Sequence, residues 1–233
     1  AYRIAEILGL AVWCEDEAGP YQTVPYPGHH WCPSGQPQRQ PHEYFREGTA
    51  KLLTLFHPVT GQVRMKGVTR SHNVILYAWL KTELTTILAA LPAPVSQSAE
   101  QVRCLWQSWQ AGLSLSFGLS ANPPALRLLL VMDNLAGHKS PEWVSWCFQN
   151  GILPLYTPLG GSWLNMAESI QRIIKRRALD GTYPQTVLTM IEWLEATAQG
   201  WNQDPTPFVW GGARQQRRQA QRERSLHRLG GSG

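Results

Sequence analysis

The sequence predicts a mixed α/β fold, with helices packed on the faces of a sheet. The apolar run Leu126–Met132 and the shorter run Ile152–Tyr156 have the length and composition of buried strands, and a helical pattern separates them. Such a strand-helix-strand unit pairs its strands in parallel. A hairpin pattern over residues 51–66, with Pro58 and Gly61 in its turn, adds antiparallel strands to the same sheet.

The remaining elements follow from apolar spacing and from turn residues. The first apolar run, Ile7–Cys14, predicts a strand that delivers Glu15, Asp16 and Glu17 and breaks at Gly19-Pro20. A long irregular connection follows over residues 25–41. Helices are expected at 71–91 with Ser71 or Asn73 as cap, at 99–112, from Ser140-Pro141 to Asn150-Gly151, at 164–179 and at 185–201.

Composition and charge place the chain among globular proteins and limit its partners. It has 233 residues, of which 43% are hydrophobic and 16% charged, and it contains no apolar run of the roughly 18 residues that span a bilayer. The N-terminus lacks a signal-peptide pattern, and the four cysteines form no CxxC pair, so we expect reduced, buried thiols in a cytoplasmic protein.

The basic character is concentrated near the C-terminus. Six arginines and one glutamate between residues 214 and 228 account for the whole net charge of +5. This tail suits the phosphate backbone of a nucleic acid, although a solvated helix end would have the same composition. The final Gly230–Gly233 has the composition of a flexible linker.

Three acidic side chains are candidate metal ligands. Asp133 follows the apolar strand directly, Glu168 begins the helical segment at 164–179, and Asp16 follows the first strand. Carboxylates that meet at one sheet edge repel one another unless a cation lies between them, and hard oxygen ligands favour Mg²⁺ or Mn²⁺. Two such ions can clamp a phosphodiester for hydrolysis or transfer.

Basic and polar residues accompany these acids. Arg172 and either Lys175 or Arg176 share a helix face with Glu168, where they would follow a nucleic-acid backbone or simply form a surface salt bridge. Asn134, His138 and Lys139 lie in the loop after Asp133, where each could contact substrate or cap the loop. Ser162 is a candidate helix cap, and Trp163 a candidate core residue.

The stretches 131–139 (VMDNLAGHK) and 156–168 (YTPLGGSWLNMAE) resemble the second and third acidic motifs of DDE transposases of the mariner-like bacterial insertion-sequence superfamily. The 34 residues between Asp133 and Glu168 match the spacing of that group. The stretch 12–19 (VWCEDEAG) is similar to the first motif, and the resemblance assigns Asp16 as the ligand, with Glu15 and Glu17 as rivals. The resemblance covers about residues 5–200.

This resemblance implies a ribonuclease H-like mixed five-stranded sheet flanked by helices. It implies two Mg²⁺ or Mn²⁺ ions held by Asp16, Asp133 and Glu168, and cleavage and transfer of DNA strands in cut-and-paste transposition. Double-stranded DNA, as transposon end and target, would be the partner of a homodimer in the bacterial cytoplasm at the nucleoid. The DNA-binding candidates are Asn134, His138, Lys139, Arg172, Lys175, Arg176, Arg214, Arg217 and Arg218.

The expected organisation is a catalytic domain over residues 1–205 with a helical insertion at about 92–122, then the basic tail at 206–229. Because no helix-turn-helix pattern precedes the first strand, we expect recognition of DNA ends to need a separate N-terminal module or protein. Two alternatives remain at this stage. One is a nuclease of the same fold without strand transfer, and the other is a non-catalytic DNA-binding protein derived from a transposase.

Overall fold

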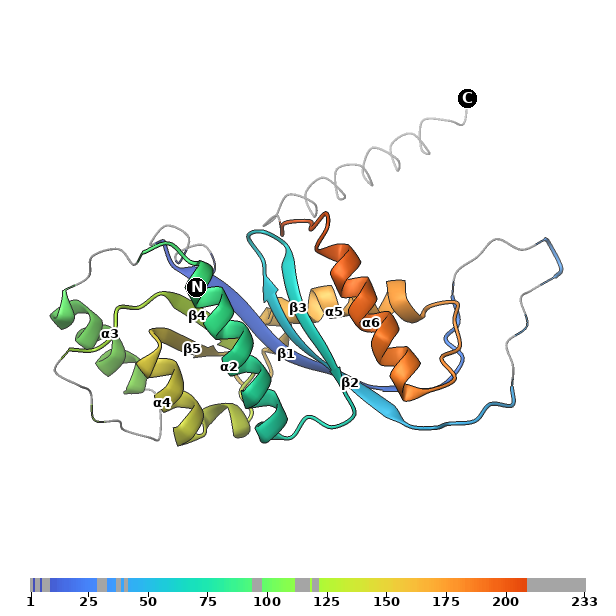
Figure 1. The fold of residues 1–233 in the computed structure, drawn as a ribbon, viewed down its shortest axis with the longest axis horizontal. Helices are drawn as coiled ribbons and strands as arrows, with labels where there is room; N and C mark the ends of the chain where they lie inside the picture. Colours follow the sequence, from blue (N-terminus) through green and yellow to red (C-terminus); the bar gives the residue numbers. More distant parts are fainter. Residues whose placement is uncertain are drawn as a thin grey trace, which may run out of the picture.

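A computed structural model describes residues 2, 5, 9–28, 33–36, 39, 42–93, 98–111, 118 and 122–208. Its centre is a five-stranded sheet with the strand order β3-β2-β1-β4-β5 (Figure 1). The pairs β1–β2 and β2–β3 are antiparallel, whereas β1–β4 and β4–β5 are parallel. This mixed sheet flanked by helices confirms the predicted ribonuclease H-like fold class, including the parallel strand-helix-strand unit.

The helices and strands lie close to the ranges that the sequence predicted. The strands are β1 (Ala11–Gln22), β2 (Thr49–His57), β3 (Gln62–Val68), β4 (Leu128–Met132) and β5 (Ile152–Tyr156). The helices are α2 (Asn73–Ala90), α3 (Ala99–Gln110), α4 (Pro141–Gln149), α5 (Ala167–Leu179) and α6 (Val187–Trp201). Ser140 caps α4 as expected, but His72, rather than Ser71 or Asn73, precedes α2, and its side chain makes no capping hydrogen bond.

The first strand differs from its prediction in extent. β1 continues through the acidic residues to Gln22, so Asp16 lies within the strand and not after its end. The Gly19-Pro20 pair, expected to end the strand, instead shifts the register with β2 between Ala18 and Tyr21. Glycine suits this position because its φ is +110° and an added Cβ would lie 2.9 Å from the Ala50 carbonyl oxygen.

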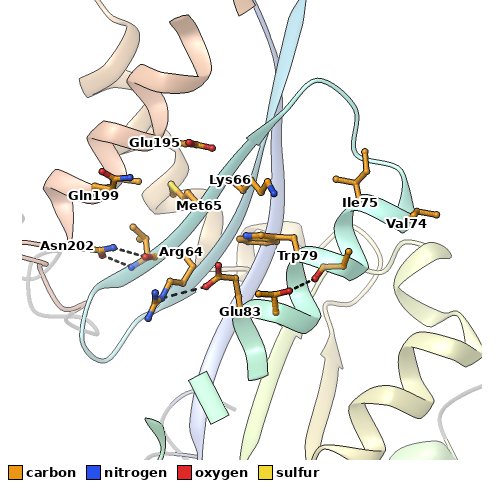
Figure 2. A pocket seen from close by; sticks show the side chains of 14 residues that line it. Arg64, Met65, Lys66, Val74, Ile75, Trp79, Glu83, Glu195, Gln199 and Asn202 are labelled. Atoms are coloured by element: carbon orange, nitrogen blue, oxygen red, sulfur yellow. Dashed lines mark hydrogen bonds and ion pairs between the residues drawn. The ribbon is translucent and has the colours of Figure 1, made fainter. Parts of the chain in front are cut away.

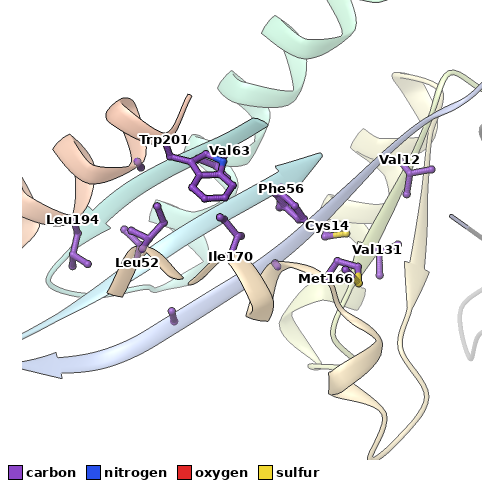
Figure 3. Packing of buried hydrophobic residues seen from close by; sticks show 14 of the residues in the cluster. Val12, Cys14, Leu52, Phe56, Val63, Val131, Met166, Ile170, Leu194 and Trp201 are labelled. Carbon is purple, nitrogen blue, oxygen red and sulfur yellow. The ribbon is translucent and has the colours of Figure 1, made fainter. Parts of the chain in front are cut away.

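Each face of the sheet has its own hydrophobic core. Alternate residues of β1 point to opposite faces, as the period-2 geometry of a strand requires. Val12 and Cys14 lie on the face covered by α3, α5 and α6, with Val131 and Met166 in the same cluster (Figure 3). On the other face Trp13 packs in a cluster formed with α2 and α4. This alternation decides which acidic side chain of β1 can face α5.

The edge strand β3 is covered by side chains of α6. Asn202, at the end of α6, accepts a hydrogen bond from the Val63 N–H (2.9 Å) and donates one to its carbonyl (2.8 Å) (Figure 2). Glu195 accepts from the Gly67 N–H (2.8 Å). These contacts satisfy edge groups that would otherwise be available to pair with another strand. Asn202 and Glu195 also line one side of a groove of about 830 Å³ between β3, α2 and α6. In this groove Arg64 forms an ion pair with Glu83 (3.9 Å).

The cysteines agree only in part with the prediction of buried thiols. Cys14 and Cys147 are free and buried as expected, whereas the free Cys104 is exposed.

Among the described residues, each helix is too short or too polar to cross a membrane. The basic tail beyond Phe208, with Arg214, Arg217 and Arg218, lies outside the described residues, as do Cys32 and most of the segment 112–121.

Candidate active site at the junction of β1, β4 and α5

The three predicted acidic residues lie in or next to three elements that come together toward one end of the sheet. Asp16 lies in β1, Asp133 follows β4 directly, and Glu168 is the second residue of α5. Cys14 of β1 pairs in parallel with Val131 of β4, so continuing this register by two residues places Asp16 beside Asp133. Glu168 lies next to this pair because α5 packs on β1 through the shared core.

The electrostatics of Asp16 show that the other two carboxylates lie near enough to affect it. Burial raises the pKa of Asp16 to about 6, and the charges of Asp133 and Glu168 contribute to the increase. The Glu17 N–H donates a hydrogen bond to Asp16 Oδ1 (2.9 Å), which lowers the pKa of Asp16 and so opposes the increase. Repulsion among the carboxylates is therefore built into the site, and a bound cation would relieve it.

The alternation of side chains along β1 separates Asp16 from its two acidic neighbours. Asp16 points to the α5 face, whereas Glu15 and Glu17 point to the opposite face. Glu17 pairs with Lys51 (3.3 Å), and Glu15 is fully buried against His138. Of the three acids in the first motif, only Asp16 therefore shares a face with Glu168.

His138 is placed differently from the sequence prediction. Its side chain is 3% exposed, with Nδ1 2.6 Å from Asp133 Oδ1 and Nε2 3.6 Å from Glu15 Oε2. Burial lowers the pKa of His138, but the two carboxylates outweigh this effect and raise the pKa to about 9. Burial likewise raises the pKa of Asp133, and the His138 contact reverses this so that the pKa falls below its usual value. His138 is therefore buried between two acidic side chains, and not at the surface where the predicted DNA contact would lie.

The other predicted DNA contacts vary in exposure. Arg172 is 81% exposed and forms the predicted i, i+4 pair with Glu168 (3.4 Å), while Arg176 is exposed one turn further on. Lys175 is engaged with Asp180 (2.7 Å). Lys139 lies over the ring of Tyr156, 5.3 Å from its centroid.

An open groove of about 420 Å³ runs from the acids along β1 and α5. Asp16, Glu168, Arg172 and Lys175 are among the residues that line it. Its lining also includes Gln171, which lowers the pKa of Asp16 and donates a hydrogen bond to Thr54 Oγ1 (3.2 Å). The groove therefore joins two acids of the site to cations on α5.

The segment before α5 corrects two predictions. Trp163 was expected in the core, but its side chain is 73% exposed. Ser162 is not the cap of α5, because it begins a separate 3₁₀ turn (η2, Ser162–Leu164) and α5 starts after Met166 without a side-chain cap from that residue. The residue that contacts the start of α5 is Asn165, which accepts from the Ala167 N–H (3.1 Å).

Sequence reasoning missed roles for three polar residues around the acids. Glu15, Asn165 and Gln171 are buried, with exposures of 0%, 3% and 6%. The burial of Gln171 could have been predicted from the sequence, since this residue lies three positions after Glu168 and falls on the apolar side of the helix. For Glu15 and Asn165 the deciding contact joins positions far apart in the chain, which local pattern does not reveal.

The chemistry of the donor set fits a hard divalent cation. Asp16, Asp133 and Glu168 offer carboxylate oxygens, and the buried Asn134 Oδ1 has no hydrogen-bond partner. In the portion of the chain that the structure describes, no three Asp, Glu, His or Cys side chains lie close enough together to hold a metal ion. Glu168 is turned toward Arg172.

The pKa of Asp16 predicts a stability cost that the metal-free protein carries at neutral pH. The folded pKa of about 6 exceeds the ordinary 3.8, so the folded state binds more protons between these values, and stability falls as pH rises through this window. At about 1.4 kcal/mol per pKa unit, Asp16→Asn should stabilise the protein by about 2 to 3 kcal/mol at pH 7.5 and by little below pH 4. Urea unfolding in EDTA at both pH values measures this. The exposed Asp204→Asn is the control, and an equal effect of Asp16→Asn at both pH values would contradict the prediction.

Comparison with known proteins gives the family. Residues 11–191 match the family described as DDE superfamily endonuclease. A search of curated proteins gives no match. Among solved structures, the chain is similar to the catalytic core domain of BIV integrase, with 15% identity, a TM-score of 0.39, and coverage of 86% of this chain and 88% of that one.

Two structures of Mos1 are also similar. The pre-cleavage Mos1 transpososome matches with 13% identity, a TM-score of 0.37, and coverage of 89% of this chain. The Mos1 strand transfer complex matches with 11% identity, a TM-score of 0.44, and coverage of 87%. This chain spans 60% and 54% of those two chains. The family match covers most of the chain and confirms the resemblance seen in the acidic motifs, so this protein belongs to the DDE superfamily endonuclease family.

Proposed function

We propose that this chain is the catalytic domain of a DNA transposase, which cleaves DNA strands and joins a freed 3′ end to target DNA. The proposal is supported by the position of Asp16, Asp133 and Glu168 toward one end of the sheet, within a chain of the DDE endonuclease family. Asp16 lies in β1, Asp133 follows β4, and Glu168 lies in the first turn of α5.

Asp16, Asp133 and Glu168 would hold two Mg²⁺ or Mn²⁺ ions. Metal bound there would stabilise negative charge on the phosphodiester and lower the pKa of the attacking water or 3′ hydroxyl. The contact of His138 Nδ1 with Asp133 Oδ1 leaves Asp133 Oδ2 for coordination. Gln171 approaches Asp16 from the helix side and lowers its pKa.

Cations beside the acids would bind the DNA backbone. Arg172 and Arg176 lie on the exposed side of α5, and Arg172 would leave its weak surface pair with Glu168 when phosphate and metal arrive. Lys139 and the arginines Arg214, Arg217 and Arg218 would add contacts to transposon-end or target DNA. We also propose that the protein acts as a homodimer on DNA, together with a separate N-terminal DNA-binding module, at the bacterial nucleoid.

The experiment uses a labelled DNA duplex carrying a transposon end, incubated with the protein and Mg²⁺ or Mn²⁺. Metal-dependent nicking together with joining of a pre-cleaved 3′ end to target DNA is the expected result. Nicking without joining would replace the proposal with a ribonuclease H-like nuclease. DNA binding that needs the tail 214–228, with no metal-dependent product, would identify a non-catalytic binding protein.

A further inference from the structure

One buried amide connects the two acidic elements that are farthest apart in the sequence. Asn165 Nδ2 donates to the Glu15 carbonyl oxygen (2.6 Å), and Asn165 Oδ1 accepts from the Ala167 N–H (3.1 Å). Glu15 directly precedes Asp16, and Ala167 directly precedes Glu168. A single side chain therefore fixes the peptide beside the first acid to the peptide beside the third.

The position requires a side chain that both donates and accepts. The first N–H groups of α5 need acceptors, because a helix start leaves them without intrahelical partners, and Met166 supplies no side-chain cap. The Glu15 carbonyl needs a donor. An amide meets both needs at once, whereas a carboxylate or an aliphatic side chain cannot. Figure 3 shows Met166, the residue after Asn165, beside Cys14 and Val131, where α5 begins over β1 and β4.

The side chain of Glu15 makes the second connection, on the other face of the sheet. Its carboxylate is completely buried, and the His138 imidazole lies 3.6 Å from Oε2. The opposite nitrogen of that ring is 2.6 Å from Asp133. Glu15 is thus joined through its backbone to α5 and through its side chain to the residue that follows β4.

We propose that Asn165, Glu15 and His138, together called the Glu15 brace, are positioning residues that set the spacing of Asp16, Asp133 and Glu168 for metal binding. Partners of this kind orient the carboxylates without coordinating metal, and they tune affinity through the ligands that they hold. The inference rests on the proposed metal-dependent function and assigns Glu15, a rival ligand in the sequence, to the support of the site.

Two substitutions at Asn165 separate the brace from simple helix capping. Asn165→Ser keeps a hydroxyl that can accept from the start of α5, because serine is a good capping residue, but it is too short to reach Glu15. Asn165→Asp keeps the acceptor and turns an oxygen toward the Glu15 carbonyl in place of the donor. Gln203→Glu, at an exposed position after α6, controls for the added charge.

The measurements are Mn²⁺ binding by titration calorimetry, thermal unfolding in EDTA, and DNA cleavage as a function of Mn²⁺ concentration. Both Asn165 variants should raise the Mn²⁺ Kd by about 10- to 100-fold. Their cleavage should recover at high Mn²⁺, because all three ligands are still present. Glu168→Gln should not recover, since it lacks a ligand. Gln203→Glu should match the wild type in every readout.

Two results would overturn the inference alone: wild-type Mn²⁺ affinity in the Asn165 variants, or folded variants whose lost cleavage does not return at high Mn²⁺. If both Asn165 variants fail to fold, His138→Gln decides through the same Mn²⁺ titration, with an unchanged Kd counting against the brace. A wild-type protein that neither binds Mn²⁺ nor cleaves DNA would overturn the proposed function as well, which separates the two failures.

Discussion

Replacing Glu168 with glutamine is expected to reduce metal-dependent DNA nicking by at least about 10³-fold, which corresponds to about 4 kcal/mol of transition-state stabilisation. A neutral amide cannot supply the negative charge that a shared divalent cation needs. The fold should survive, because Glu168 pairs with Arg172, which is 81% exposed, and such surface pairs contribute about 0 to 1 kcal/mol. Nicking of a labelled duplex, with circular dichroism of the same samples, measures both effects.

The chain contains a matched control for this change. Glu142 is also the second residue of a helix, α4, and it also pairs with a basic side chain, Lys81, at 2.9 Å. Glu142→Gln should therefore reproduce any effect on helix start and surface charge while leaving nicking unchanged. Nicking that persists in Glu168→Gln, or that falls equally in both variants, would remove Glu168 from the catalytic site.

Truncation of Trp143 is expected to have the largest effect on stability, about 3 to 5 kcal/mol for Trp143→Ala. Its side chain is completely buried in the core between the sheet, α2 and α4. The ring stacks on Tyr77, with centroids 5.3 Å apart, and on Trp146 at 5.5 Å. Alanine would leave a cavity that this close-packed face cannot fill. Urea unfolding monitored by circular dichroism gives the change in free energy.

Trp143→Phe tests the reason for that loss. The Nε1 of Trp143 is buried without a hydrogen-bond partner in the described structure, so phenylalanine removes an unsatisfied donor while it keeps most of the apolar ring. Its cost should be less than half that of alanine. A Trp143→Ala variant that loses under about 1 kcal/mol would contradict the burial seen here, and equal costs for both variants would contradict the cavity explanation.

Much of the fold could be predicted because its signals are local. The hairpin, the parallel unit around α4 and the ends of most helices follow from apolar period, proline and glycine, and the structure places them within a few residues of the prediction. β1 was predicted too short, because Glu15, Asp16 and Glu17 look like the start of a loop. They are accommodated within a strand because Lys51 pairs with Glu17, and because burial raises the pKa of Glu15 to about 8 and so disfavours its charged form.

Exposure in the site was harder to predict than position. Trp163 is exposed and His138 is buried, the reverse of what their residue types suggest in a loop. A short 3₁₀ turn carries Trp163 outward, whereas the carboxylates on each side of His138 compensate for its burial. Both outcomes depend on partners from other elements.

By itself the sequence indicated the candidate acids and the order in which the helices and strands occur. The Asp133 and Glu168 motifs, with the spacing between them, were sufficient to indicate the family that the comparison then showed. Only the tertiary structure decided that Asp16 faces α5 while Glu15 faces His138, because a strand sends successive side chains to opposite faces and the faces exist only once the sheet is packed. Contacts across 150 residues, such as that from Asn165 to Glu15, have no local signature, since they form only when the folded chain brings β1 and α5 together.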